Sequence, residues 1–182
     1  GNSGHLVRVD SERAALVDAI QHVVLAAHSR CPNLVITVPA SLRRSGQDLE
    51  HLTGEGIPVR LVKGSYLEQK DVSFLDREEI DLHFMRLIET LFRLGVSPTV
   101  ATHDPKLIEF ADDMAFIFGL SDGDFEYELL HGLCDEQLKT LPPAGKKVSV
   151  YLPYGDQWYP HFMRRLADQP SLAWSLLHQR SS

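Results

Sequence analysis

The sequence is poor in cysteine, in long apolar runs and in positive charge. Cys31 and Cys134 are the only cysteines among 182 residues, too few for a disulfide framework or a cysteine-rich zinc site. We expect both to be reduced thiols used as small apolar residues. No uninterrupted apolar run approaches the ~20 residues of a transmembrane helix, and no basic-then-apolar signal segment opens the chain. The default expectation is a cytosolic protein.

The shortage of positive charge excludes one class of partner. Lys and Arg number 18 and Asp and Glu number 25, which leaves a net charge of −7. We expect no general nucleic-acid binding, because no broad basic face would attract phosphate. A local cationic pocket remains compatible with this charge. The length, with 43% apolar and 24% charged residues, indicates one soluble globular domain over residues 1–182, or part of a larger one such as its C-terminal portion. We expect residues 1–4 to be a loop or an expression scar.

The sequence does contain a regular alternation of strand-like and helix-like segments. Short apolar runs recur, and each is followed by a segment with apolar residues at helical spacing. The predicted strands are 5–10, 33–38, 57–64, 97–104, 125–132 and 147–155. The predicted helices are 13–29, 41–56, 77–95, 105–119, 134–141 and 156–169, with a terminal helix near 171–178. Repeated strand–helix units predict a parallel sheet with right-handed crossovers, in either a doubly wound sheet or a (β/α) barrel.

The ends of the predicted strands favour the barrel. Nearly every strand ends on, or just before, a polar residue: Asp10, Lys63, Thr102 with His103, His131 and Tyr154. In a barrel these ends converge on one mouth, whereas in an open sheet they are spread along an edge. A complete eight-unit barrel takes about 250 residues. We therefore expect an α/β fold of the distorted (β/α)8 TIM-barrel type, with about six of the eight units in this chain.

A six-unit barrel would leave two parallel edges unpaired, which an isolated domain has to cover or pair. We expect the barrel to be completed by an oligomer, by a partner chain that carries the first strands, or by a terminal segment.

The stretch RLVKGSY, at residues 60–66, ends a predicted strand on two cations and a glycine. Arg60 and Lys63 lie three positions apart, so their side chains point to opposite faces unless the strand is ending. At a strand end Lys63 can turn into the barrel mouth, while Gly64 permits a close backbone approach. These residues alone favour an anion site and an ordinary solvated strand end equally.

The next strand ends on Thr102 and His103, which add a hydroxyl and an imidazole to the same mouth. A histidine there can be a general base, a metal ligand or a donor to phosphate. His103, His131 and Asp10 lie on different strands, and no close pair of histidines occurs at the spacing of hydrolytic zinc helices. We therefore expect no metal site.

Arg164 and Arg165 are adjacent near the start of the helix predicted at 156–169. Two guanidiniums in that position suit bidentate capture of a carboxylate. The alternative is a basic turn on an amphipathic helix, with Asp156 and Asp168 as local ion-pair partners.

Five motifs, in the order RLVKGSY, ATHD, FEYELLHG, VYLPYG and WYPHFMRRLAD, resemble the proline dehydrogenase family, most closely its stand-alone bacterial form. The likeness runs from His5 to Leu177. It implies a distorted (β/α)8 barrel that binds FAD and oxidises L-proline to Δ1-pyrroline-5-carboxylate by hydride transfer to the flavin. It also implies a cytoplasmic enzyme, in peripheral contact with the inner membrane, that passes the electrons to a quinone.

The resemblance implies a role for each matching residue. The residues that would hold the FAD pyrophosphate and the flavin, or contact the cofactor from the next strand, are Arg60, Lys63, Gly64, Thr102 and His103. The residues that would bind the proline carboxylate are Arg164 and Arg165, and those that would line the pocket of the proline ring are Tyr66, Leu130 and Tyr151. Asp10 would belong to the polar network beneath that ring, and Asp10 and Tyr151 are the catalytic candidates.

The chain departs from the family pattern at three places. The first two barrel strands are absent, and with them a lysine that reaches the substrate. Where the family usually has Gln-Ala-Tyr, this chain has Pro39-Ala40-Ser41, and proline offers neither the amide that contacts the flavin nor a backbone N–H. His161 stands where the family often has Tyr. A non-catalytic homologue that keeps the fold and a carboxylate site is therefore an alternative hypothesis, and a related substrate such as hydroxyproline is a third.

Overall fold

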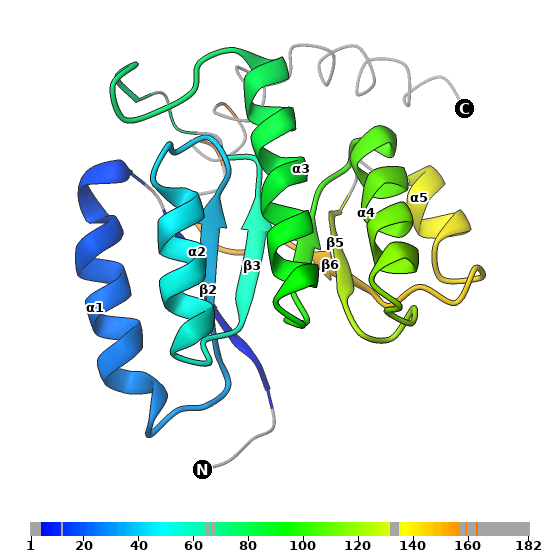
Figure 1. The fold of residues 1–182 in the computed structure, drawn as a ribbon, viewed down its shortest axis with the longest axis horizontal. Helices are drawn as coiled ribbons and strands as arrows, with labels where there is room; N and C mark the ends of the chain where they lie inside the picture. Colours follow the sequence, from blue (N-terminus) through cyan, green and yellow to red (C-terminus); the bar gives the residue numbers. More distant parts are fainter. Residues whose placement is uncertain are drawn as a thin grey trace.

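The chain forms a sheet of six parallel strands (Figure 1). The computed structural model describes residues 5–11, 13–64, 66, 68–131, 135–156, 159 and 163. The strands are β1 Val7–Val9, β2 Leu34–Pro39, β3 Val59–Val62, β4 Thr99–Ala101, β5 Glu126–Leu130 and β6 Val148–Tyr151. Each strand pairs in parallel with the next one in the sequence. This order runs in one direction, as in a barrel, whereas a doubly wound sheet reverses its order at a switch point.

A helix follows each of the first five strands. The helices are α1 Val17–His28, α2 Ser45–Gly54, α3 Arg77–Arg93, α4 Pro105–Ile117 and α5 Asp135–Thr140, and the 3-10 turn η1 Ala14–Leu16 precedes α1. The side chains of Asp76 and Asp104 cap α3 and α4 by accepting hydrogen bonds from backbone N–H groups of the first turn. Pro105 begins α4, and Gly95 follows α3 with a φ of 68°, in agreement with the start predicted at residue 105 and the end predicted at residue 95. None of the described helices is long and apolar enough to cross a membrane.

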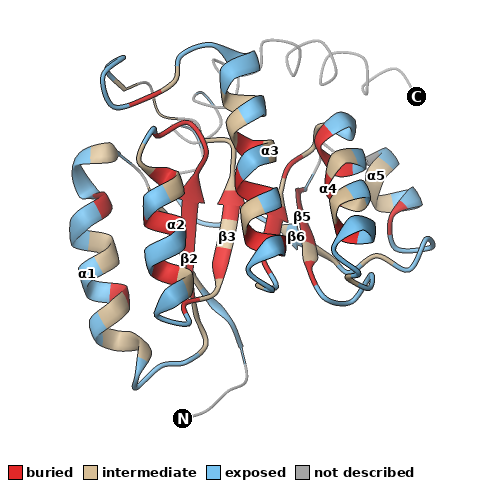
Figure 2. Cartoon of the chain, viewed as in Figure 1, coloured by how far each residue is buried: buried red, intermediate tan, exposed pale blue. Residues whose placement is uncertain are grey.

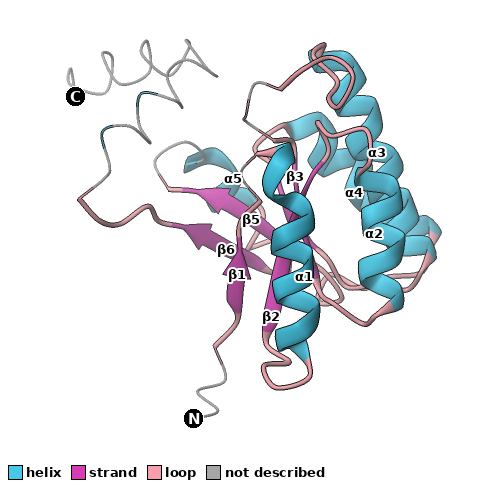
Figure 3. Cartoon of the chain, turned by 90° about the vertical axis from the view of Figure 1, so that its left-hand side faces the viewer, coloured by secondary structure: helices cyan, strands magenta, loops and turns pink. Residues whose placement is uncertain are grey.

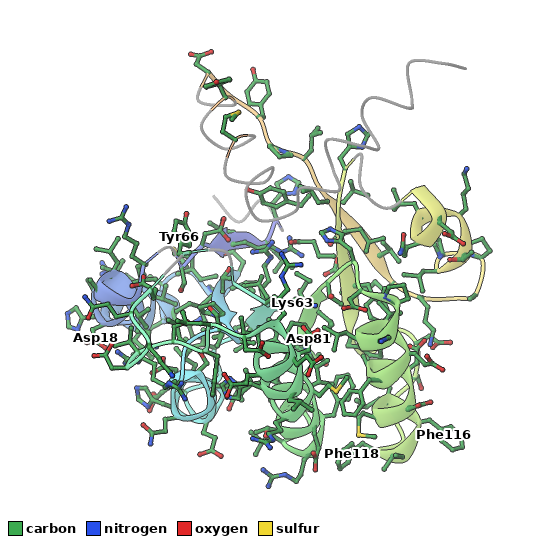
Figure 4. The ribbon with its side chains drawn as sticks, turned by 90° about the horizontal axis from the view of Figure 1, so that it is seen from above. Asp18, Lys63, Tyr66, Asp81, Phe116 and Phe118 are labelled. Atoms are coloured by element: carbon green, nitrogen blue, oxygen red, sulfur yellow. The ribbon has the colours of Figure 1, made fainter. Side chains whose placement is uncertain are left out.

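The sheet curls, and the helices lie along its outer side. In Figure 3, α2, α3 and α4 stand together on one side of the strands. Seen from above in Figure 4, the helices form an arc around the strands. The predicted barrel is confirmed in the form of a curled half-barrel of six strands. Among the described residues β1 pairs only with β2 and β6 only with β5, so both edges of this half-barrel are open there.

The outer face of the sheet carries the apolar core. Every second residue of the central strands points outward and is almost inaccessible: Ile36, Val38, Val59, Leu61, Val100, Tyr127 and Leu129. Helix α3 meets them with apolar side chains at helical spacing, Phe84, Leu87, Ile88 and Leu91. Figure 2 shows the buried residues gathered on the strands and on the helix faces that turn toward them. Burial of this apolar surface is the main source of stability.

Some local predictions are wrong. The helix predicted from residue 13 begins as η1, and neither η1 nor α1 has a side-chain cap, because their N-cap residues are Arg13 and Leu16. The helix predicted from residue 41 begins at Ser45, because backbone hydrogen bonds hold residues 41–43 against the loop that follows β3. Cys31 is a free thiol, but it is exposed rather than packed as an apolar residue. Cys134 lies outside the described residues.

Candidate functional site

The inner face of the half-barrel is polar where the outer face is apolar. The pairing register places Thr37, Arg60, Thr99 and Glu126 in one row across four strands. Strand alternation adds three further charged residues to this face, namely Arg8, Asp10 and Glu128. The charged residues come from β1, β3 and β5, which are alternate strands. Inside a closed barrel, side chains from alternate strands form layers. The inner face of this half-barrel has the same layered arrangement.

Arg60 lies at the centre of the inner face, and its side chain is 11% exposed. Its Nε donates to Glu128 Oε1 at 2.6 Å, and its Nη2 contacts the same oxygen. On the other side, Nη1 donates to Asp10 Oδ1 at 2.9 Å and to Thr37 Oγ1 at 3.3 Å. The ring centroid of Tyr151 lies 5.5 Å from the guanidinium carbon. The guanidinium is therefore held by carboxylates of two strands and by the aromatic ring of a third.

Glu128 joins the two arginines of the inner face. Its side chain is 4% exposed, and its Oε2 lies 3.1 Å from Arg8 Nε. Arg8 Nη2 in turn lies 3.2 Å from Glu126 Oε2. The Nε–H of Arg8 is not aligned with an acceptor among the described residues, so its contact with Glu128 is an ion pair without a well-formed hydrogen bond. A buried carboxylate is costly unless it is paired, and here each oxygen faces a different cation.

Lys63 points to the opposite side of β3 from Arg60, as the spacing predicts. Its Nζ lies 2.6 Å from Asp81 Oδ1 on α3 and 3.0 Å from Asp104 Oδ2 at the start of α4. Figure 4 shows Lys63 and Asp81 next to each other. Burial raises the pKa of Asp104, but the hydrogen bond and the charge of Lys63, with the backbone N–H of Lys106, leave this pKa below its ordinary value. Lys63 thus lies just past the end of β3 and contacts α3 and the N-cap residue of α4, and its role at a cofactor stays a prediction.

Gly64 is required by a close approach within the chain itself. Its φ is 95°, and a Cβ at this position would lie 2.2 Å from Ser41 Oγ and 3.2 Å from Pro39 Cβ. Only glycine fits both the backbone conformation and the space. The close approach predicted for Gly64 therefore exists, and the partner is the segment Pro39-Ala40-Ser41 that departs from the family pattern.

The loops that follow β2 and β3 are tied together beside this contact. Leu42 and Ser73 form an isolated β-bridge, and the backbone N–H of Phe74 donates to the carbonyl of Ser41 at 2.8 Å. The guanidinium of Arg43 lies over the ring of Phe74 at 4.3 Å. The loops that follow the neighbouring strands β2 and β3 are therefore held against each other by backbone and side-chain contacts.

Thr102 and His103 use their side chains within the fold. The backbone N–H of Leu130 donates to His103 Nε2 at 3.0 Å, so the neutral imidazole carries its proton on Nδ1. The buried Thr102 Oγ1 accepts from the backbone N–H of Asp104 at 3.2 Å. His103, a cofactor candidate, is thus brought directly against Leu130, a candidate for the substrate pocket.

The remaining candidates are distributed unevenly. Tyr151 pairs with Leu130 in the strand register, so these two pocket candidates lie side by side on the inner face. Tyr66 is half-buried in the loop after β3, and Figure 4 places it apart from Lys63. His131 and Tyr154 are exposed. Arg164, Arg165 and His161 lie outside the described residues, and in the described part no group of three His, Cys, Asp or Glu side chains is placed to hold a metal ion.

The sequence interpretation missed Glu128 and Arg8. The signal was available, because each lies two residues before a chosen candidate on the same strand, Leu130 and Asp10. Positions two apart on a strand share one face, so charged residues there belong to the same surface as the candidates.

The model of the family described as Proline dehydrogenase matches residues 2–169. Proline dehydrogenase 2 of Bacillus subtilis (strain 168) is 31% identical over 166 residues, which is 91% of this chain and 55% of that protein. The proline dehydrogenase of Deinococcus radiodurans is 31% identical over 169 residues, 92% of this chain and 54% of the relative. The chain therefore spans about half the length of the curated relatives it matches.

Solved structures agree on the fold. Proline utilization A from Bdellovibrio bacteriovorus, inactivated by N-propargylglycine, superposes with a TM-score of 0.81 at 21% identity. The superposition covers 88% of this chain and 19% of that much longer one. A Bradyrhizobium japonicum proline utilization A variant gives a TM-score of 0.78 at 21% identity, over 89% of this chain and 19% of the other.

Proposed function

Because this chain belongs to the proline dehydrogenase family, we propose that it carries the cofactor- and substrate-binding part of an FAD-dependent enzyme that oxidises L-proline to Δ1-pyrroline-5-carboxylate. Residues 1–182 act as one barrel domain in this proposal. The observation that carries it is the convergence of Asp10, which directly follows β1, with Arg60, Leu130 and Tyr151 of β3, β5 and β6 on one inner face. A barrel enzyme builds its active site from strand ends in this way.

The residues at the barrel mouth fit an anionic, aromatic cofactor in their chemistry. Among the described residues, Lys63 Nζ donates one hydrogen bond, to Asp104 Oδ2, and forms an ion pair with Asp81 without hydrogen-bond geometry. Its side chain is 35% exposed, so the ammonium group has further donors for a phosphate. Arg60, Lys63, Gly64, Thr102 and His103 are the residues that would hold FAD. When bound, the flavin supplies the acceptor for a hydride from the carbon beside the substrate amine.

The protein's own contribution to this reaction is orientation. Arg164 and Arg165 would bind the proline carboxylate through bidentate hydrogen bonds. Leu130, Tyr151 and Tyr66 would form the wall of the ring pocket. Asp10 pairs with Arg60 on one side, and the ring centroid of Tyr151 lies 5.5 Å from its guanidinium carbon, so both catalytic candidates lie next to the same cation. Correct placement of reacting groups alone is worth several powers of ten in rate.

The partners follow from the proposed chemistry. The electrons taken from proline would go on to a quinone. In this proposal the protein would work in the cytoplasm, with peripheral contact to the membrane that holds this acceptor. The open edges at β1 and β6 support completion of the barrel by an oligomer, a partner chain or a terminal segment.

The test is reconstitution of the purified protein with FAD, followed by proline-dependent reduction of an artificial electron acceptor dye. We expect a yellow protein that retains flavin through gel filtration and reduces the dye with L-proline. Hydroxyproline is assayed in parallel, and turnover of hydroxyproline alone would reassign the substrate. Protein that takes up no FAD would overturn the enzyme proposal.

One observation favours a second candidate, a non-catalytic homologue that keeps the fold. Pro39 ends β2 beside Gly64, where its ring approaches the backbone of the proposed cofactor residues and offers no N–H. Binding of FAD or of L-proline without dye reduction would be the result expected of this homologue.

A further inference from the structure

Glu128 holds a central place among the charged groups of the inner face. It lies in the middle of β5, with 4% of its side chain exposed. Its Oε1 accepts the 2.6 Å hydrogen bond from Arg60 Nε, and its Oε2 faces Arg8. A buried carboxylate is costly unless its partners compensate for the loss of water, so these contacts matter for the fold.

The contacts of Glu128 decide the orientation of Arg60. A guanidinium has five N–H donors in one plane. Those of Nε and Nη2 reach Glu128, whereas those of Nη1 reach Asp10 and Thr37. Without Glu128 the plane would be held at Nη1 alone, and the side chain of Asp10 is 52% exposed. A guanidinium held at one nitrogen can turn about that contact, so the two-sided grip is what fixes the plane.

Arg8 supports this arrangement from the far side. It neutralises Glu128 through the 3.1 Å ion pair and is itself held by Glu126. Because the Nε–H of Arg8 is not aligned with Glu128, its hold is weaker than that of Arg60. The chain of contacts runs from Glu126 through Arg8, Glu128 and Arg60 to the ring of Tyr151.

We propose that Glu128 is a positioning residue, which fixes the guanidinium plane of Arg60 against Tyr151, and that Arg8 is its second support. The proposal rests on the proposed function, since that function places Arg60 at the cofactor and Tyr151 at the substrate. The property that matters is the reach of the carboxylate to Arg60 Nε, and its charge is secondary.

Two substitutions separate reach from charge. Glu128→Gln keeps the length of the side chain and an oxygen that can accept from Arg60 Nε, but it removes the charge. Glu128→Asp keeps the charge and removes one methylene, so its carboxylate falls short of Arg60. Arg8→Met, as a third variant, removes the second support and leaves the contact between Glu128 and Arg60 intact.

The first readout needs no activity. In protein labelled with 15N-arginine, the Nε–H of Arg60, assigned by its disappearance in Arg60→Lys, should exchange slowly because it is buried and hydrogen-bonded. We expect exchange to accelerate about tenfold or more in Glu128→Asp and to stay within about threefold of wild type in Glu128→Gln and Arg8→Met. Equal exchange in all four proteins would overturn the proposal.

The second readout is steady-state turnover of L-proline by the FAD-loaded protein. We expect Glu128→Asp to lower kcat by about tenfold to a hundredfold with KM changed less than about threefold, as misplacement of an orienting group does. Glu128→Gln should restore kcat to within about threefold of wild type. The reverse order, with Asp active and Gln inactive, would show that charge decides and would overturn the positioning role.

The two readouts distinguish a failure of the proposed function from a failure of the positioning role of Glu128. If the wild-type protein turns over no proline, the proposed function has failed, and the exchange of the Arg60 Nε–H alone then decides whether Glu128 orients Arg60. If exchange accelerates in Glu128→Asp while kcat stays unchanged, Glu128 is a structural partner of Arg60 with no part in the reaction, and the proposal is overturned.

Discussion

Arg60 and Leu61 are neighbours in β3, yet they belong to two different parts of the molecule. Leu61 points outward and is completely buried in the apolar cluster between the sheet and the helices. Arg60 points inward to Asp10, Glu128 and the ring of Tyr151. The outer face stabilises the fold through apolar burial. On the inner face, the burial of charged groups costs free energy, and their contacts hold these groups in fixed orientations. Substitutions on the two faces should therefore fail in different ways.

The largest effect is expected on the outer face, from Phe84→Ala in α3. Phe84 is completely buried, and its removal should lower the free energy of unfolding by about 3–5 kcal/mol, through lost burial and the cavity left behind. Leu82→Ala on the same helix is the control, because Leu82 is 56% exposed and should cost no more than about 0.5 kcal/mol. Urea denaturation measures both, and equal losses would contradict this division of the helix.

The next effect is expected on the inner face, from Arg60→Met. It leaves Glu128 and Asp10 without their shared cation, but Arg8 still faces Glu128. We expect the free energy of unfolding to fall by about 2–3 kcal/mol. This is somewhat less than for a buried carboxylate that loses its only cation, because Arg8 remains beside Glu128. The double variant Arg60→Met with Glu128→Met should recover part of that stability in urea denaturation, since no buried charge of this pair remains unpaired. No recovery would mean that packing, rather than charge, explains the loss.

Gly64→Ala tests the junction between the two faces at the end of β3. The new Cβ would meet Ser41 Oγ, and the φ of 95° is strained for alanine, so we expect a loss of about 1–2 kcal/mol. Combining it with Ser41→Gly should remove the collision and leave the backbone strain. Gly54→Ala in α2 is the matched control, because nothing lies within 4 Å of its Cβ, and it should stabilise by up to about 1 kcal/mol. Thermal melts of these three variants and of the wild-type protein decide whether Gly64 differs from an ordinary glycine.

The sequence predicts the outer face well and the inner face only in part. The spacing of apolar residues in α3 and the alternation along the strands determine where the core lies, and Pro105 and Gly95 mark helix ends through their own backbone geometry. The ion pairs of Arg60 with residues of β1 and β5 join positions 50 and 68 residues away in the chain. Only the curl of the sheet brings these residues together, so no local pattern could have predicted the pairing.

The late start of α2 is likewise a result of contacts between distant parts of the chain. Residues 41–43 have a helix-compatible sequence, but hydrogen bonds to the loop after β3 stabilise them as a turn. Tertiary contacts of this kind override local preference.

The smallest effect is expected from the ion pair of Lys63 on the helix side. The pKa of Asp104 is below its ordinary value of 3.8 when the protein is folded, so its stabilising contribution is complete above that value and is lost as the pH falls through the lower, folded pKa. We expect stability to decline with acid below about pH 4, and Lys63→Met to make that decline shallower. Urea denaturation at a series of pH values measures the slope. An unchanged slope would mean that other carboxylates account for the acid sensitivity.

The most direct measurement of the division between the faces is FAD affinity in the neighbouring variants Arg60→Met and Leu61→Ala, under conditions where both are folded. We predict that Arg60→Met weakens FAD binding about tenfold or more, equivalent to about 1.4 kcal/mol, because the proposed cofactor contact is lost. Leu61→Ala should be less stable but bind FAD within about threefold of wild type. Wild-type affinity in Arg60→Met, an equal loss in Leu61→Ala, or no FAD uptake by the wild-type chain would contradict the account.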